Sequence, residues 1–259
     1  NSGTSFSAPR IAYYVAKLFN LYPTYNFNLI KALLINSASI PTERPFPLSE
    51  ININDVGYKA ITLLNVYGYG KPNIEKAMKS ESNRVILIRE NKIKLKKFHI
   101  YPVYLPIEFI DGRGDKTLSV TLVYDPPVNR NRTDYLGSAF EFHLYKDSTI
   151  EEVIDEYKQM EREHETLTES KEEKVPNKLK SKEIKLYPGP DIRKRGVHQR
   201  GTITFKRRYI DVTKPLILLV YCLDRWIRDD NYIQDYAVLI SIEHSERIDI
   251  YNQIRIRNQ

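Results

Sequence analysis

Apolar positions near the start of the chain recur with the period of an α-helix. A first helix is predicted from about Thr4 to Asn20, and its apolar positions share one face: Ala8, Ile11, Ala12, Val15 and Phe19. A second helix is predicted over Asn28–Ser37, and it is apolar on nearly every side: Leu29, Ile30, Ala32, Leu33, Leu34 and Ile35. Such a helix needs partners on most of its faces, so we expect it to be buried.

After Ser82 the period of the apolar positions changes from that of a helix to that of a strand. Arg84–Arg89 is rich in β-branched residues, and Lys92–Lys96 alternates strictly between charged and apolar side chains. Further strands are predicted at Val103–Ile110, Thr117–Tyr124, Ser138–Tyr145, Thr202–Arg207, Leu216–Leu223 and Ala237–Glu243. Many strands with few intervening helices predict an antiparallel β-sandwich, jelly-roll-like in type.

One turn and one insertion interrupt these strands. Asp111–Asp115 contains two glycines and is predicted as a hairpin turn, although its Arg-Gly-Asp tripeptide also resembles an adhesion motif. Ser148–His164 carries apolar residues at helical spacing and predicts an amphipathic helix. Glu163–Glu183 is dominated by charged and polar residues and predicts a mobile, solvated loop, with a regulatory or partner-binding flap as the alternative.

Composition narrows the class of protein. The chain has 259 residues, 41% of them hydrophobic, and no apolar run reaches the roughly 18 residues of a membrane span. A single cysteine, Cys222, excludes an internal disulfide and a cysteine-rich metal site. The net charge of +7 is compatible with an acidic partner.

The candidate chemistry lies at the beginning of the chain. Ser5 is placed at the N-terminus of the first predicted helix, where free amides and the helix dipole stabilise negative charge. Pro9 is expected in the first turn, where its missing N–H has no cost. An ordinary helix capped by a Ser or Thr is the alternative interpretation.

The stretch from Gly3 to Tyr13 resembles the serine motif of the subtilisin-like proteases, G-T-S-M-A-x-P-H-V-A-G. The residues that match in register are Gly3, Thr4, Ser5, Pro9 and Ala12. Ile11 replaces the motif's valine, and four other positions differ: Phe6, Ser7, Arg10 and Tyr13. Tyr13 replaces a glycine, which puts the close packing of this helix in doubt.

The resemblance implies that Ser5 is the nucleophile of a serine endopeptidase and that its backbone N–H is an oxyanion donor. In this family the triad runs Asp, His, Ser along the chain. Every histidine here follows Ser5 (His99, His143, His164, His198 and His244), so we expect the Asp and His upstream of Asn1. The chain is then the C-terminal portion of a longer protease and is inactive alone, because a serine hydroxyl needs an adjacent base.

Two further segments extend the resemblance to about residue 80. Asn36-Ser37-Ala38 resembles a run that often ends the helix after the serine helix in this family. Tyr67–Ala77 resembles the G-x-G-x-x-N-x-x-x-A segment that closes the catalytic domain. A phosphate-binding loop is the alternative, but the third glycine and a βαβ unit are missing. We therefore predict two regions: residues 1–81, the helical remnant of an α/β catalytic domain, and the sandwich at 82–259.

Other functions and partners follow from these interpretations. A protein or peptide is the expected substrate, and the alternative function is a non-catalytic sandwich that binds a protein partner, such as an ATPase encoded beside some of these proteases. The histidines lack metal-ligand spacing, and calcium, common in the family, is expected only outside this chain, because Asp111 and Asp115 are too few. A basic patch around His198 could bind nucleic acid (Arg193, Lys194, Arg195, Arg200, Lys206, Arg207 and Arg208), but we favour a solvated sandwich face.

Without the upstream parallel sheet, the second predicted helix would lack its usual partner. Exposed apolar patches mark surfaces of association. We therefore expect the chain to self-associate through residues 8–36, with Leu29, Leu33 and Leu34 at the centre of the contact.

Overall fold

The computed structural model describes residues 4–52, 58–166, 175–206, 209–229, 231–246 and 248–257. The elements are α1 (Thr4–Leu21), α2 (Phe27–Ser37), the 3-10 helix η1 (Leu48–Glu50), α3 (Tyr58–Tyr67), α4 (Ile74–Met78), β1 (Arg84–Lys94), β2 (Lys97–Val103), α5 (Ile107–Asp111), β3 (Lys116–Tyr124), β4 (Ser138–Tyr145), α6 (Ile150–Thr166), α7 (Pro190–Arg193), β5 (His198–Phe205), β6 (Leu216–Asp224), β7 (Ile233–His244) and α8 (Tyr251–Arg257). The predicted mixed α and β class with antiparallel sheets is confirmed. Among the described helices, none is long and apolar enough to span a membrane.

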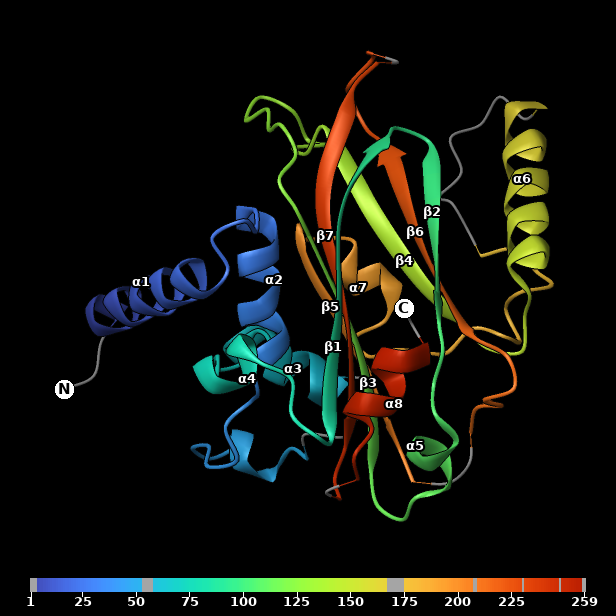
Figure 1. Cartoon of the computed structure of the whole chain (residues 1–259). Helices are drawn as coiled ribbons and strands as arrows, with labels where there is room; N and C mark the ends of the chain where they lie inside the picture. The colour runs from blue at the N-terminus through green and yellow to red at the C-terminus, as the bar shows by residue number, and fades with distance from the viewer. Residues whose placement is uncertain are drawn as a thin grey trace.

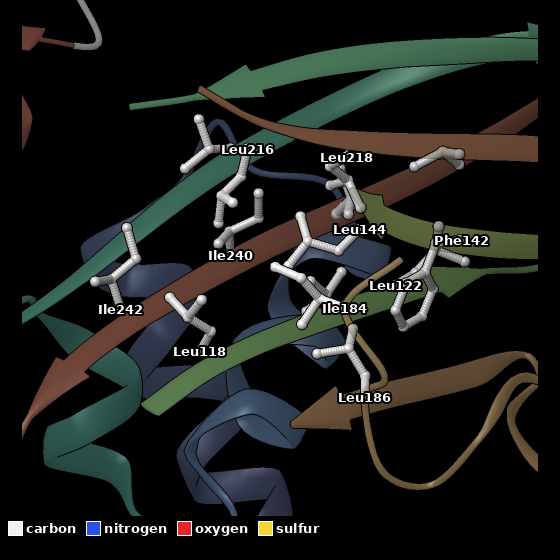
Figure 2. Packing of buried hydrophobic residues seen from close by; sticks show 14 of the residues in the cluster. Leu118, Leu122, Phe142, Leu144, Ile184, Leu186, Leu216, Leu218, Ile240 and Ile242 are labelled. Atoms are coloured by element: carbon white, nitrogen blue, oxygen red, sulfur yellow. The ribbon is translucent and has the colours of Figure 1, made fainter. Parts of the chain in front are cut away.

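The strands form two antiparallel sheets. The four-stranded sheet has the order β1-β7-β3-β5, and the three-stranded sheet has the order β2-β6-β4. Their facing sides share one hydrophobic cluster, in which Leu118 and Ile240 come from the first sheet and Phe142 and Leu218 from the second (Figure 2). Alternate residues along each strand therefore enter this core, as the pleat requires.

A helix covers the outer side of each sheet (Figure 1). On the four-stranded sheet, α2 packs against β3 and β7 in a cluster that includes Leu29, Val123 and Leu239. On the three-stranded sheet, α6 packs Val153 and Tyr157 against residues of β4 and β6. The central strand β6 is consequently buried on both faces, which explains its nearly continuous apolar sequence.

The position of α2 corrects the expected self-association surface. The three leucines that we placed at the centre of a contact between copies (Leu29, Leu33 and Leu34) are buried inside one molecule. The helix packs on the four-stranded antiparallel sheet, whose strands follow it in the sequence. The expectation that these leucines are exposed is therefore wrong, and any association between copies would have to use other side chains.

Several strand predictions agree with the structure and others fail. Ser138–Tyr145 is β4 as predicted, and the predicted Thr117–Tyr124 lies within β3. The strand predicted at Val103–Ile110 is wrong, because β2 ends at Val103 and the next apolar residues form α5. Short apolar runs do not distinguish a strand from a helix, and here Phe109 and Ile110 are buried from a single helical turn.

Two predicted turns and loops also need correction. Asp111–Asp115 is not a hairpin, since it joins α5 to β3, and β3 pairs with β5 and β7. The loop predicted as mobile up to Glu183 is ordered from residue 175: Leu179 is fully buried, and Lys182 forms an ion pair of 2.5 Å with Glu152 of α6. Residues 167–174 lie outside the described part of the chain.

Candidate functional site

Ser5 lies in the first turn of α1 and is exposed. Figure 1 shows α1 projecting away from the sheets, with the N-terminus at its far end. Thr4 is the first helical residue, and Gly3 lies outside the described residues. Because the first amides of a helix have no intrahelical acceptor, the Ser5 N–H is free to donate to a developing oxyanion.

Pro9 occupies a different position from the one predicted. It is inside α1, beyond the first turn, rather than at the first helical position. Its ring removes the N–H that would have donated to the carbonyl of Ser5 in a regular helix. The backbone at Ser5 therefore lacks one helical hydrogen bond.

The apolar face of α1 is divided into a packed half and an exposed half. Leu18, Val15 and Phe19 belong to the cluster beneath α2. Toward the N-terminus, by contrast, Ile11 of the same face is 37% exposed, and on the other side of the helix Phe6 is 60% exposed and Tyr13 is 55% exposed. The end of the helix that carries Ser5 thus presents apolar side chains to solvent.

None of the histidines whose side chains the structure describes contacts Ser5. His99 Nδ1 lies 2.7 Å from Tyr236 Oη, and His244 Nδ1 accepts from the backbone N–H of Glu246 at 3.0 Å. His198 begins β5, and the side chain of His164 lies outside the described residues. Burial lowers the pKa of His99, His198 and His244, but these residues belong to strands of the sheets and not to α1.

His143 has a contrasting environment on the outer face of β4. Burial alone would lower its pKa, but hydrogen bonding to Glu141 and Glu183 outweighs burial and raises it. Its Nδ1 lies 2.6 Å from Glu183 Oε1, and its Nε2 lies 3.7 Å from Glu141 Oε2. The raised pKa favours the protonated imidazole, which joins Glu183 of the segment after α6 to β4.

The glycine-containing segment of residues 67–77 has a structural explanation. Gly70 has φ +99°, and a Cβ there would lie 2.2 Å from the backbone of Ser39, which pairs with Lys71 through two hydrogen bonds. Asn73 caps α4 by accepting from the N–H of Lys76, and Ala77 is buried against α2. The glycine therefore allows the backbones of residues 70 and 39 to approach closely. This contact accounts for the glycine, so a phosphate-binding role is not needed to explain it.

The run Asn36-Ser37-Ala38 joins this segment to the sheet. Thr121 Oγ1 of β3 donates to Asn36 Oδ1 at 3.3 Å. Ser37 Oγ donates to the carbonyl of Leu34 and accepts from the N–H of Asn73 at 3.2 Å. The two segments that extended the family resemblance therefore contact each other, although they are far apart in the sequence.

The basic residues around His198 have different environments. The Arg193 side chain is buried and donates to the carbonyls of Leu186, Pro188 and Phe142. Lys194 pairs with Glu141, and Arg207 and Arg208 lie outside the described residues. Arg193 and Arg200 thus bond to backbone carbonyls, whereas Arg195 is exposed and the Lys206 side chain is 80% exposed.

No group of His, Cys, Asp or Glu within the described ranges is arranged to hold a metal ion. Cys222 is fully buried on the inner side of β6, where it packs as an apolar side chain. Sequence reasoning missed two polar contacts, His143 with Glu183 and Arg200 with the end of α2. Neither pair follows a local pattern.

Comparison with known proteins gives a family match over the first part of the chain. Residues 1–70 match the model of the subtilase family. The chain is also 30% identical over 256 residues to an uncharacterized protein, y4bN, of Sinorhizobium fredii. That alignment covers 99% of this chain and 56% of the relative, so the chain spans about half the relative's length.

A solved structure, that of tomato aspermy virus, aligns with 65% of this chain and 80% of its own at 14% identity. The TM-score is 0.26, which is too low to establish a shared fold.

Proposed function

We propose that this chain is the C-terminal portion of a subtilisin-like serine endopeptidase and that Ser5 is its nucleophile. The match of residues 1–70 to the subtilase family carries this proposal, because the serine motif lies in that stretch. The exposed position of Ser5 in the first turn of α1 supports it. In this role Ser5 Oγ attacks the scissile carbonyl of a protein or peptide substrate, and the Ser5 N–H donates to the resulting oxyanion.

The reaction requires a base that removes the Ser5 proton. His99, His143 and His244 bond to other groups on the sheets, so we assign the base and its orienting Asp to residues outside this chain. The exposed apolar side chains Phe6 and Tyr13 support this assignment, because they leave apolar surface uncovered on the N-terminal half of α1, which carries Ser5. The isolated chain is then inactive.

We further propose that residues 82–259 form a β-sandwich domain that is jelly-roll-like in type. The hydrophobic cluster shared by the two sheets supports this classification. The helices at residues 4–78 would be the part of the catalytic region that packs on the outer side of the four-stranded sheet.

Peptide hydrolysis by the longer protein tests this proposal. Ser5→Ala should reduce kcat by a factor on the order of 10⁶, the loss that removal of the triad serine causes in subtilisin. Ser7→Ala is the matched control, because Ser7 is an exposed hydroxyl in the same helix. Equal activity of Ser5→Ala and wild type would refute the assignment, and so would hydrolysis by the isolated chain that depends on Ser5.

A further inference from the structure

Arg200 of β5 reaches the carboxyl end of α2, which lies beside it in the fold (Figure 1). Its Nη1 donates to the carbonyl of Ala38 at 2.5 Å and to that of Ile35 at 3.2 Å. The backbone N–H of Arg200 donates to Tyr69 Oη at 2.9 Å. One residue of the second region therefore binds both segments that extended the subtilase resemblance.

The position of this cation suits the end of a helix. The last carbonyls of a helix lack intrahelical donors, and the dipole there favours positive charge. The last turn of α2 contains no basic residue of its own, so Arg200 supplies the charge from the sheet. Burial lowers the pKa of Arg200, yet an arginine remains protonated in proteins.

The hydrogen bonding of Arg200 favours a geometric role over a purely stabilising one. Its Nε is buried and has no hydrogen-bond partner among the described residues. A buried cation that is incompletely paired contributes little net stability, because desolvation offsets its hydrogen bonds. Its hydrogen bonds instead fix the position of the carboxyl end of α2 on the sheet.

The end of α2 is connected to the rest of the subtilase-like region. Ser37 bonds to Asn73 at the start of α4, and Ser39 pairs with Lys71. On its other side α2 packs against α1 through the cluster that contains Leu18 and Leu29. A rotation of α2 on the sheet would therefore move α1, whose first turn carries Ser5.

We propose that Arg200 is a positioning residue that fixes α2, and through it α1, on the four-stranded sheet. The strands then belong to the catalytic unit and are not a separable binding module. The part of this inference that concerns Ser5 rests on the proposed function. The contact between Arg200 and α2 does not depend on it.

Hydrogen exchange on the chain itself tests the contact. Arg200→Met should speed exchange of the last amides of α2 and of Ser39 and Lys71 by roughly tenfold or more, the effect expected from losing hydrogen bonds to a charged group. Amides of β6 should keep their rates. Arg195→Met is the matched control, because Arg195 is an exposed arginine beside the same strand.

Arg200→Lys separates geometry from charge, since lysine restores the cation without the planar guanidinium. An intermediate exchange rate for the end of α2 supports the proposal. Faster exchange of every amide to the same extent would overturn the proposal, because Arg200 would then act on global stability. Unchanged exchange at the end of α2 would also overturn it, because Arg200 would then have no effect on that helix.

Labelling of the longer protein by a fluorophosphonate tests the connection to Ser5. Arg200→Met should slow the labelling rate by roughly tenfold while the folded fraction, measured by circular dichroism, stays that of Arg195→Met. Unchanged labelling of Arg200→Met would overturn the positioning role. If the wild type is not labelled either, the proposed function fails, and the exchange result alone decides whether Arg200 couples the regions.

Discussion

Removal of the Leu29 side chain tests whether the subtilase-like helices and the strands form one cooperative unit. Leu29 of α2 is 1% exposed and packs in the cluster that also contains Val123 and Leu239 of the sheet. Leu29→Ala deletes three carbon atoms, at about 0.8 kcal/mol for each buried methylene. The cavity left behind adds to this loss, so we expect a total of about 3 kcal/mol, within the range measured for buried leucines.

The assay is thermal unfolding followed by circular dichroism. In a chain of this size, 1 kcal/mol shifts Tm by roughly 2–4 °C, so Leu29→Ala should lower Tm by about 6–12 °C in a single transition. Leu21→Ala is the matched control, because Leu21 is 46% exposed at the end of α1. Its effect should remain within about 0.5 kcal/mol.

Two results would refute this reasoning. Equal shifts for Leu29→Ala and Leu21→Ala would show that α2 is not packed on the sheet as described. Two separate transitions, of which Leu29→Ala moves only one, would show that the helices and the strands unfold independently.

The remaining predictions concern a backbone contact and a buried histidine. Gly70→Ala should destabilise the chain by more than about 2 kcal/mol, because φ is +99° and the backbone of Ser39 occupies the space that a Cβ needs. Gly68→Ala is the control and should cost about 1 kcal/mol, because φ is +58° and no atom lies near the Cβ position. Equal midpoints of urea unfolding for the two variants would contradict this. The raised pKa of His143 means that its stabilising charge is fully present below the ordinary histidine pKa and is lost as pH rises through the raised value. The Tm of the wild type should therefore fall more steeply above about pH 6.5 than the Tm of His143→Gln. Parallel profiles of Tm against pH for the two proteins would show that the ion pair of His143 with Glu183 does not cause the pH dependence of stability.

Periodicity along the sequence predicted most of the local structure. The helices at Thr4–Asn20 and Asn28–Ser37 and the strand at Ser138–Tyr145 follow from spacing of apolar residues, because a helix or strand with one buried face must repeat that spacing. The error at Val103–Ile110 arose where a short apolar run fits both periods. Composition alone could not decide it.

The contacts that organise the molecule lie beyond local pattern. Arg200 and Tyr69 are 131 residues apart, and His143 and Glu183 are 40 apart, so neither pair has a spacing that sequence reasoning could recognise. The partner of α2 was also unpredictable, because an apolar helix face specifies burial without specifying the surface that buries it. The role of Ser5 stays a prediction, drawn from its motif and its place in α1.

Identification of the modified residue after fluorophosphonate treatment tests the central claim most directly, because the reagent reports an activated serine without requiring a known substrate. We predict that mass spectrometry of the longer protein will locate the adduct on Ser5, with none on Ser7, and that the isolated chain will not react. An adduct on another serine of the longer protein, or equal labelling after Ser5→Ala, would contradict the account.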